Sequence, residues 1–139
     1  MARFFGRYEH SLDDKGRVIL PSKFRAPFEH GGFLTPYQDG CLSLWTPDQF
    51  EEQMEAMLGR AGTSRSNRNM ARLWASTSHE LDIDRQGRMA IPARLRAYAG
   101  LAGDVLVLGA IDRVELWNRQ AWDEKVLPEE ERLTQGDDG

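Results

Sequence analysis

The 139-residue sequence has little cysteine and no long hydrophobic run. A single cysteine, Cys41, cannot form an internal disulfide, which is typical of a protein kept in a reducing cytoplasm. No apolar stretch approaches the roughly 20 residues that a membrane-spanning helix needs. The opening residues Met1–Arg7 also lack the apolar core of a signal peptide. We therefore expect a cytoplasmic protein that does not bind a membrane.

The sequence also lacks the patterns of the common enzyme classes. It contains no Walker-type phosphate loop and no dinucleotide-binding glycine pattern. Its three histidines, His10, His30 and His79, do not have the spacing of metal ligands. His10 and His79 lie near Asp13 and Asp82 in the sequence, but no nucleophile is placed with them. We predict a protein that is not an enzyme, with no catalytic residue, no metal site and no cofactor.

The net charge of −4 is unevenly distributed along the chain. Residues 123–139 carry a formal charge of −5, whereas residues 1–25 carry +3. The stretch Gly59–Arg72 contains no acid and four arginines, which are Arg60, Arg65, Arg68 and Arg72. Binding of phosphate groups requires local rather than total positive charge, so a nucleic-acid partner remains compatible with this composition. The four arginines themselves fit an interface, a DNA flank or a solvated helix face.

A sequence unit occurs twice along the chain. Residues 13–25 (DDKGRVILPSKFR) align with residues 84–96 (DRQGRMAIPARLR) at a shift of 71, with Asp, Gly, Arg, Pro and the last Arg identical. Past one inserted residue the match continues, so that residues 42–45 (LSLW) align with residues 114–117 (VELW). Two copies in the same order over most of the chain indicate an internal duplication.

The duplication predicts the same short elements in each half. We expect strands at 8–12 and 79–83 that enter a hairpin turn, strands at 18–20 and 89–91 that leave it, and then a second hairpin, 33–37 with 42–45 and 105–108 with 114–117. Pro21 and Pro92 suit the first position of a short helix, and Thr46 and Asn118 suit the N-caps of longer ones. A further helix is expected at 66–76.

Neither half has enough apolar residues for a core of its own, so the two halves are expected to interleave. The prediction from the residues is an α+β, β-rich fold with two tandem halves, pseudo-two-fold symmetry and short helices. We place the first repeat at 5–58, a basic linker and helix at 59–76, the second repeat at 77–127 and a disordered acidic tail at 128–139.

The repeated loops Asp13-x-x-Gly16-Arg17 and Asp84-x-x-Gly87-Arg88 are the best candidates for a functional site. Aspartate at the start of a turn accepts N–H bonds from the loop, and glycine permits the bend. An arginine on such a rigid support can read O6 and N7 of guanine with both arms of its guanidinium. The tip residues Lys15 and Arg85 are expected to contact phosphates. The alternative is that Asp and Arg pair across the turn for structural reasons alone.

The sequence resembles the MraZ family of bacterial transcriptional regulators. The resemblance covers nearly the whole chain, including residues 5–17 (FGRYEHSLDDKGR), both Asp-x-x-x-Arg loops and both Leu/Trp strands. It implies two tandem AbrB-like swapped-hairpin (β-barrel-like) halves, binding to tandem G-containing boxes in the promoter of the division and cell-wall gene cluster, and ring-shaped homo-oligomers. Arg17 and Arg88 are then the principal contacts to double-stranded DNA, supported by Lys15 and Arg85. It also implies a nucleoid-associated location.

Further basic residues and two rival functions remain open. Arg3 and Arg7 fit an arm that reaches phosphates, or simply solvated side chains. Four others either support the short helices or touch the DNA backbone, namely Lys23, Arg25, Arg94 and Arg96. The main rival is a structural module that assembles into rings without DNA, but such a module has no use for basic residues on both loop tips. An antitoxin-like AbrB relative is disfavoured by the double-length chain.

Overall fold

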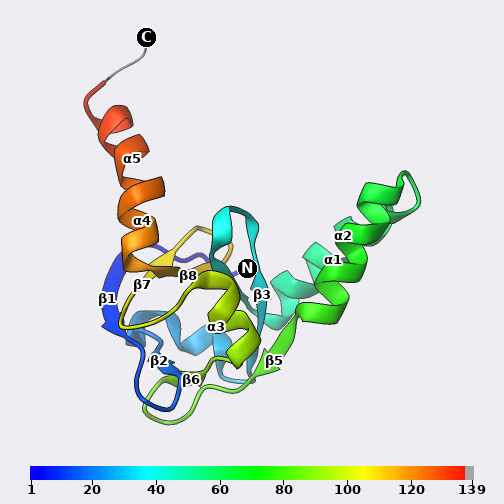
Figure 1. Ribbon diagram of the computed structural model, residues 1–139. Coiled ribbons are helices and arrows are strands. Elements are labelled where there is room, and N and C mark those ends of the chain that lie inside the picture. Colours follow the sequence, from blue (N-terminus) through cyan, green and yellow to red (C-terminus); the bar gives the residue numbers. More distant parts are fainter. Residues whose placement is uncertain (137–139) are drawn as a thin grey trace.

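The computed structural model describes residues 1–136 and shows an α+β protein with a six-stranded antiparallel sheet and a separate two-stranded ribbon (Figure 1). The strand order in the large sheet is β1-β7-β8-β4-β3-β5, and the ribbon is β2-β6. The strands are β1 (Arg7–Ser11), β2 (Arg17–Ile19), β3 (Gly32–Pro36), β4 (Leu42–Trp45), β5 (His79–Leu81), β6 (Arg88–Ala90), β7 (Asp104–Gly109) and β8 (Val114–Asn118).

The two halves interleave through this pairing, as expected. β1 from the first half pairs with β7 from the second, and β5 from the second half pairs with β3 from the first. The second hairpin of each half forms as predicted, with β3 against β4 and β7 against β8. The strands on either side of each Asp-to-Arg turn do not pair with each other along their length, as the strands of a simple hairpin do. They separate after the turn, because β2 pairs with β6 of the other half rather than with β1.

Short helices follow β2 and β6, but they differ between the halves. The first half has two 3-10 turns, η1 (Ser22–Phe24) and η2 (Ala26–Phe28), whereas the second has the α-helix α3 (Ala93–Ala99). Pro27, which has no N–H to donate, stands where the second half has Tyr98. The prediction for Pro21 and Pro92 is wrong by one residue: both are N-caps, with extended ψ angles of 141° and 144°.

Two helical arms project from the sheet (Figure 1). Thr46 and Asn118 cap the first helix of each arm as predicted, accepting N–H bonds from Gln49 and Ala121. Of the linker part of the 59–76 segment, placed at 60–66 from its Gly, Ser and Arg content, only Gly62–Ser64 separate the two helices of the first arm. The arms consist of α1 (Pro47–Ala61) with α2 (Arg65–Thr77), and α4 (Arg119–Lys125) with α5 (Leu127–Thr134); one further 3-10 turn, η3 (Gln38–Gly40), joins β3 to β4.

The prediction of a disordered tail over 128–139 is wrong for the residues that the structure describes. α5 continues the chain as a helix from Leu127 to Thr134, with Pro128 in its first turn, where the missing N–H costs nothing. Its first turn carries Glu129 and Glu130, which interact favourably with the positive end of the helix dipole. Residues 137–139 of the predicted tail lie outside the described residues.

A single core joins the two halves. Val18 and Met89, which face each other across the β2-β6 ribbon, are fully buried, and Leu20 and Ile91 are buried beside them. The same cluster contains residues from both halves of the large sheet, such as Leu34 and Val107. Because the ribbon's inner face belongs to this core, the loops at its ends are held on a rigid base. Within residues 1–136, no helix is long and apolar enough to cross a membrane.

Candidate nucleic-acid interface

The loop Asp13–Arg17 is closed by hydrogen bonds from both main chain and side chain. Gly16 N–H donates to the Asp13 carbonyl at 3.1 Å, and Asp13 N–H donates to the Arg17 carbonyl at 2.9 Å. The Asp13 carboxylate accepts from the N–H groups of Lys15 and Arg17 at 2.9 and 2.8 Å. Gly16 has a φ of 74°, a conformation that a residue with a side chain adopts only with strain. The aspartate and glycine therefore shape the loop as the sequence predicts.

The loop Asp84–Arg88 repeats every one of these bonds. Gly87 N–H donates to the Asp84 carbonyl at 2.9 Å, and Asp84 N–H donates to the Arg88 carbonyl at 3.2 Å. The Asp84 carboxylate accepts from the N–H groups of Gln86 and Arg88, each at 2.9 Å, and Gly87 has a φ of 82°. The two loops thus have the same internal construction, although Lys15 and Gln86 differ chemically.

The two loop arginines are each oriented by the aspartate of their own loop. Arg17 Nε donates to Asp13 Oδ2 at 2.8 Å, and Arg88 Nε donates to Asp84 Oδ2 at 2.7 Å. The pairing across the turn is therefore present, but it uses only Nε. Among residues 1–136, neither the Nη1 nor the Nη2 atom of either arginine has a hydrogen-bond partner. Each guanidinium is fixed at one edge and keeps its two-pronged end available for another molecule.

The same bonds stabilise the ionised form of the two aspartates. Accepted N–H bonds, chiefly from the main chain of Arg17, lower the pKa of Asp13 below 3.8, and those from Arg88 lower the pKa of Asp84 in the same way. Both carboxylates are therefore charged at neutral pH. Their contribution to loop order is complete above pH 3.8 and is lost as the pH falls through the lowered pKa.

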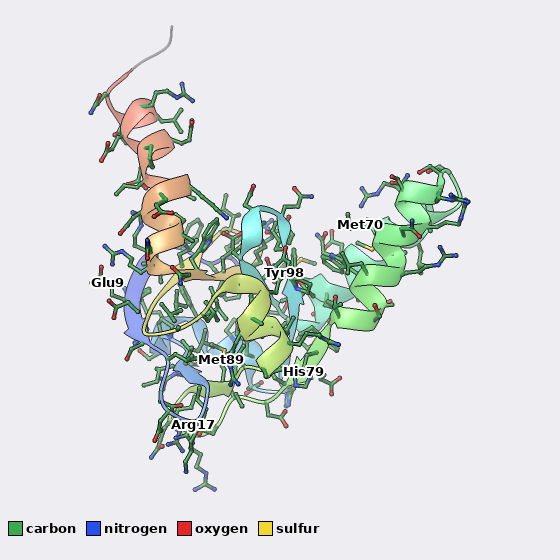
Figure 2. All side chains as sticks on the ribbon, viewed as in Figure 1. Glu9, Arg17, Met70, His79, Met89 and Tyr98 are labelled. Carbon is green, nitrogen blue, oxygen red and sulfur yellow. The ribbon has the colours of Figure 1, made fainter. Side chains whose placement is uncertain are left out.

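The β2-β6 ribbon places both arginines on one outer face. Arg17 pairs with Ala90 and Ile19 pairs with Arg88, while the alternate residues point into the core. Because side chains on a strand alternate between its two faces, Arg17 and Arg88 share the exposed face. Figure 2 shows Arg17 at the end of the molecule opposite α5, and the buried Met89 closer to the middle of the molecule. The tip residues Lys15 and Arg85 are exposed at the same end.

The structure does not bring Arg3 and Arg7 to this face. Arg7 is aligned with Leu108 at one end of the β1-β7 pair, whereas the chain reaches the Asp13 loop from the other end. Its guanidinium is ion-paired with Glu130 and lies 5.1 Å from the centre of the Trp122 ring. Arg3 precedes Phe4, whose bridge to Ile111 lies beyond that same far end of the sheet. These two arginines form part of a different surface.

The linker arginines are also separate from the loops. They lie on the α1-α2 arm, whose residue Met70 is labelled far from Arg17 in Figure 2. All four are exposed and have no ion-pair partner in the part of the chain that the structure describes. The same residues 1–136 contain no group of three or more histidine, cysteine or acidic side chains suited to a metal ion.

Sequence reasoning left two loop-supporting arginines unassigned, Arg25 and Arg96. In the structure each lies against the glycine of the other half's loop: Arg25 against Gly87, and Arg96 against Gly16. The only signal in the sequence is that an arginine recurs eight residues after the loop arginine in both copies. Which loop it meets depends on the exchange of strands between the halves. The other helix residues, Lys23 and Arg94, are exposed.

Comparison with known proteins is consistent with this geometry. The family model described as "MraZ protein, putative antitoxin-like" matches residues 3–72 and 75–138. The chain belongs to the MraZ family. Each of the two matched ranges contains one Asp-to-Arg loop and one strand of the central ribbon. A curated relative from Kocuria rhizophila, named "Transcriptional regulator MraZ", is 41% identical over 128 residues, which are 92% of this chain and 89% of the relative. The family resemblance and the fold class expected from the sequence are thus confirmed.

Proposed function

We propose that the protein is a sequence-specific transcriptional regulator that binds double-stranded DNA through the β2-β6 ribbon and its two loops. The observation that carries this proposal is the pair of arginine forks, Arg17 and Arg88, on one exposed face of a two-stranded ribbon. A two-stranded ribbon fits the major groove of B-form DNA, where an arginine fork reads guanine through O6 and N7. Lys15 and Arg85 then contact phosphates on either side.

The target we propose is the one that the family resemblance implies: short G-containing boxes repeated in tandem in the promoter of the division and cell-wall gene cluster. One protomer offers only two loops, so its affinity for a single box is expected to be modest. Several protomers in one homo-oligomeric ring raise the effective concentration of loops along a tandem array. Exposed apolar side chains on the α1-α2 arm, Leu58, Met70 and Leu73, support self-association of this kind. The protein then acts at the nucleoid, by binding and not by catalysis.

The test is fluorescence anisotropy with a duplex that carries several G-containing boxes and a scrambled duplex, each at several salt concentrations. We expect tighter binding to the boxed duplex and a steep loss of affinity as salt rises. Arg17→Ala and Arg88→Ala should each cost roughly 1–3 kcal/mol on the boxed duplex and relax its preference over the scrambled one. Lys15→Ala and Arg85→Ala are the matched controls. They should weaken binding to both duplexes alike and reduce the salt slope by about one.

Two results would contradict the proposal at different points. If the unsubstituted protein binds neither duplex at low salt, DNA binding is wrong, and the structural module that assembles without DNA takes its place. If it binds but Arg17→Ala and Arg88→Ala, folded like the parent, leave both affinity and preference unchanged, the two loop arginines do not read the bases.

A further inference from the structure

Each loop glycine is covered by an arginine that comes from the opposite half of the chain. A Cβ atom built on Gly16 would lie 1.6 Å from Nη1 of Arg96, and one built on Gly87 would lie 2.3 Å from Cζ of Arg25. Both glycines are buried, although they belong to loops at the end of the molecule. The guanidiniums therefore occupy the space that any side chain on these glycines would need. The Arg25 group lies face-on, with Nε, Cζ and Nη2 all at 2.3–2.4 Å from that Cβ position.

The same two arginines are bonded to the strand ends that hold the loops. Arg96 Nη1 donates to the Ile91 carbonyl at 3.0 Å, and the N–H of Ile91 donates to the Gly16 carbonyl at 3.0 Å. In the other half Arg25 Nε donates to the Leu20 carbonyl at 2.8 Å. The N–H of Leu20 in turn donates to the Gly87 carbonyl at 2.7 Å. Each loop is therefore fixed by one strand end and one guanidinium, both from the other half.

No carboxylate forms an ion pair with Arg25 or Arg96 among residues 1–136. Burial, together with the positive charge of nearby Arg25, lowers the pKa of His10. Neither arginine therefore acts through an ion pair within the described residues. Each instead covers the glycine of a loop and donates to a strand carbonyl. A planar guanidinium that covers a glycine and bonds a carbonyl restrains the loop in a way that a lysine ammonium does not.

We propose that Arg25 and Arg96 are crossed positioning residues: Arg96 sets the orientation of the first loop and its Arg17, and Arg25 sets that of the second loop and its Arg88. This inference deepens the proposed function and rests on it where it concerns DNA. Each reading arginine is then oriented by the half of the chain to which it does not belong. A displacement of about 1 Å in a recognition side chain is enough to lose a bidentate contact, so the support affects base preference.

The crossing is tested without DNA by hydrogen exchange of the two loops in Arg96→Lys and Arg25→Lys. Both variants keep the charge and lose the planar group. We expect Arg96→Lys to speed exchange in residues 13–18 and not in 84–89, and Arg25→Lys to do the reverse. Arg94→Lys, two residues before Arg96 and exposed, is the matched control and should change neither loop. Circular dichroism verifies that each variant folds. If a lysine variant does not fold, the glutamine variant of the same residue, Arg96→Gln or Arg25→Gln, replaces it.

The effect on recognition is tested by double-mutant cycles on the boxed duplex. Arg96→Lys should couple with Arg17→Ala by about threefold or more in Kd, as residues in one network do, and should be additive with Arg88→Ala within about twofold. Arg25→Lys should show the opposite pattern. The salt slope should stay unchanged, because the charge is kept.

Faster exchange in the loop of the same half, or in both loops equally, would overturn the crossing. Coupling of Arg96 with Arg88 in place of Arg17 would overturn it as well. A protein that binds no duplex but shows the crossed exchange pattern would overturn the DNA function and leave the crossed support standing.

Discussion

At the scale of single residues, the loops depend on glycines that serve two separate purposes. Gly16 adopts a positive φ, and its lack of a side chain makes room for Arg96. The sequence alone indicates only the first purpose, because a turn after Asp-x-x is a common place for a left-handed residue. The second purpose depends on a contact between residues 80 positions apart in the chain. Gly16 is thus both a turn residue and part of the contact between the halves.

Gly16→Ala separates these purposes when it is compared with Gly103→Ala. Both glycines have positive φ, at 74° and 64°, but a Cβ on Gly103 would meet nothing within 4 Å. Each substitution should cost about 1–2 kcal/mol of strain. Gly16→Ala should cost more in addition, because the guanidinium of Arg96 must move. Urea unfolding measures both costs, and equal destabilisation would show that Arg96 does not restrain the loop.

At the scale of elements, the ends of the chain form a surface of their own. α5 contacts α4, and its Glu130 is paired with Arg7 at the start of β1. From the sequence, Arg7 fitted either an arm that reaches phosphates or a solvated side chain. We expect the same pairing to help order the acidic segment as a helix through Thr134, because its acids have both a helix N-terminus and an arginine as partners. Composition alone predicted a disordered tail, since it does not show which distant cation the acids will meet.

Glu130→Gln tests whether that pairing orders α5. We expect faster amide exchange over residues 127–134, because the link to β1 is lost, with no change in DNA affinity, because this end lies opposite the loops. Glu129→Gln is the matched control, since within residues 1–136 Glu129 pairs only with Arg132 of the same helix. A gain of DNA affinity in Glu130→Gln, from the lost negative charge and the released Arg7, would instead place this end of the molecule against DNA. Equal exchange in both variants would show that Arg7 does not hold the helix.

At the scale of the whole molecule, stability belongs to both halves together. Four strand pairs among the described residues join one half to the other: β1 with β7, β2 with β6, β3 with β5, and β4 with β8. The most deeply buried side chains, such as Val18 and Met89, face each other across such a pair. A half on its own would expose both its core face and its unpaired strand edges.

Separate chains of residues 1–76 and 77–139 should therefore not fold alone. Each is expected to lack a cooperative unfolding transition and to show little amide dispersion by NMR, whereas the full chain unfolds in one step. An equimolar mixture should recover part of the native spectrum, because the missing strands are then supplied. Cooperative unfolding of either fragment by itself would contradict the shared core.

The turns, the helix caps, the fold class and the family could all be predicted from the sequence, because each depends on local chemistry or on the repeat. The Asp and Gly residues specify the two turns, and Thr46 and Asn118 cap their helices through bonds to residues three positions away. The duplication of this pattern indicated the fold class, and the resemblance that it carried identified the family. All these signals lie within a few residues of one another, or recur at a fixed shift, so they can be read from a single chain.

The strand pairs and side-chain contacts between the two halves are visible in the tertiary structure alone. In the fold, the strands on either side of each turn pair with different partners. Arg17 and Arg88 lie on one face, and Arg3 and Arg7 lie on another. The tertiary structure also places Arg25 and Arg96 against the loops opposite their own. The physical reason is that neither half can bury its apolar strands alone, so the strands exchange partners, and every contact that follows from the exchange is remote in sequence.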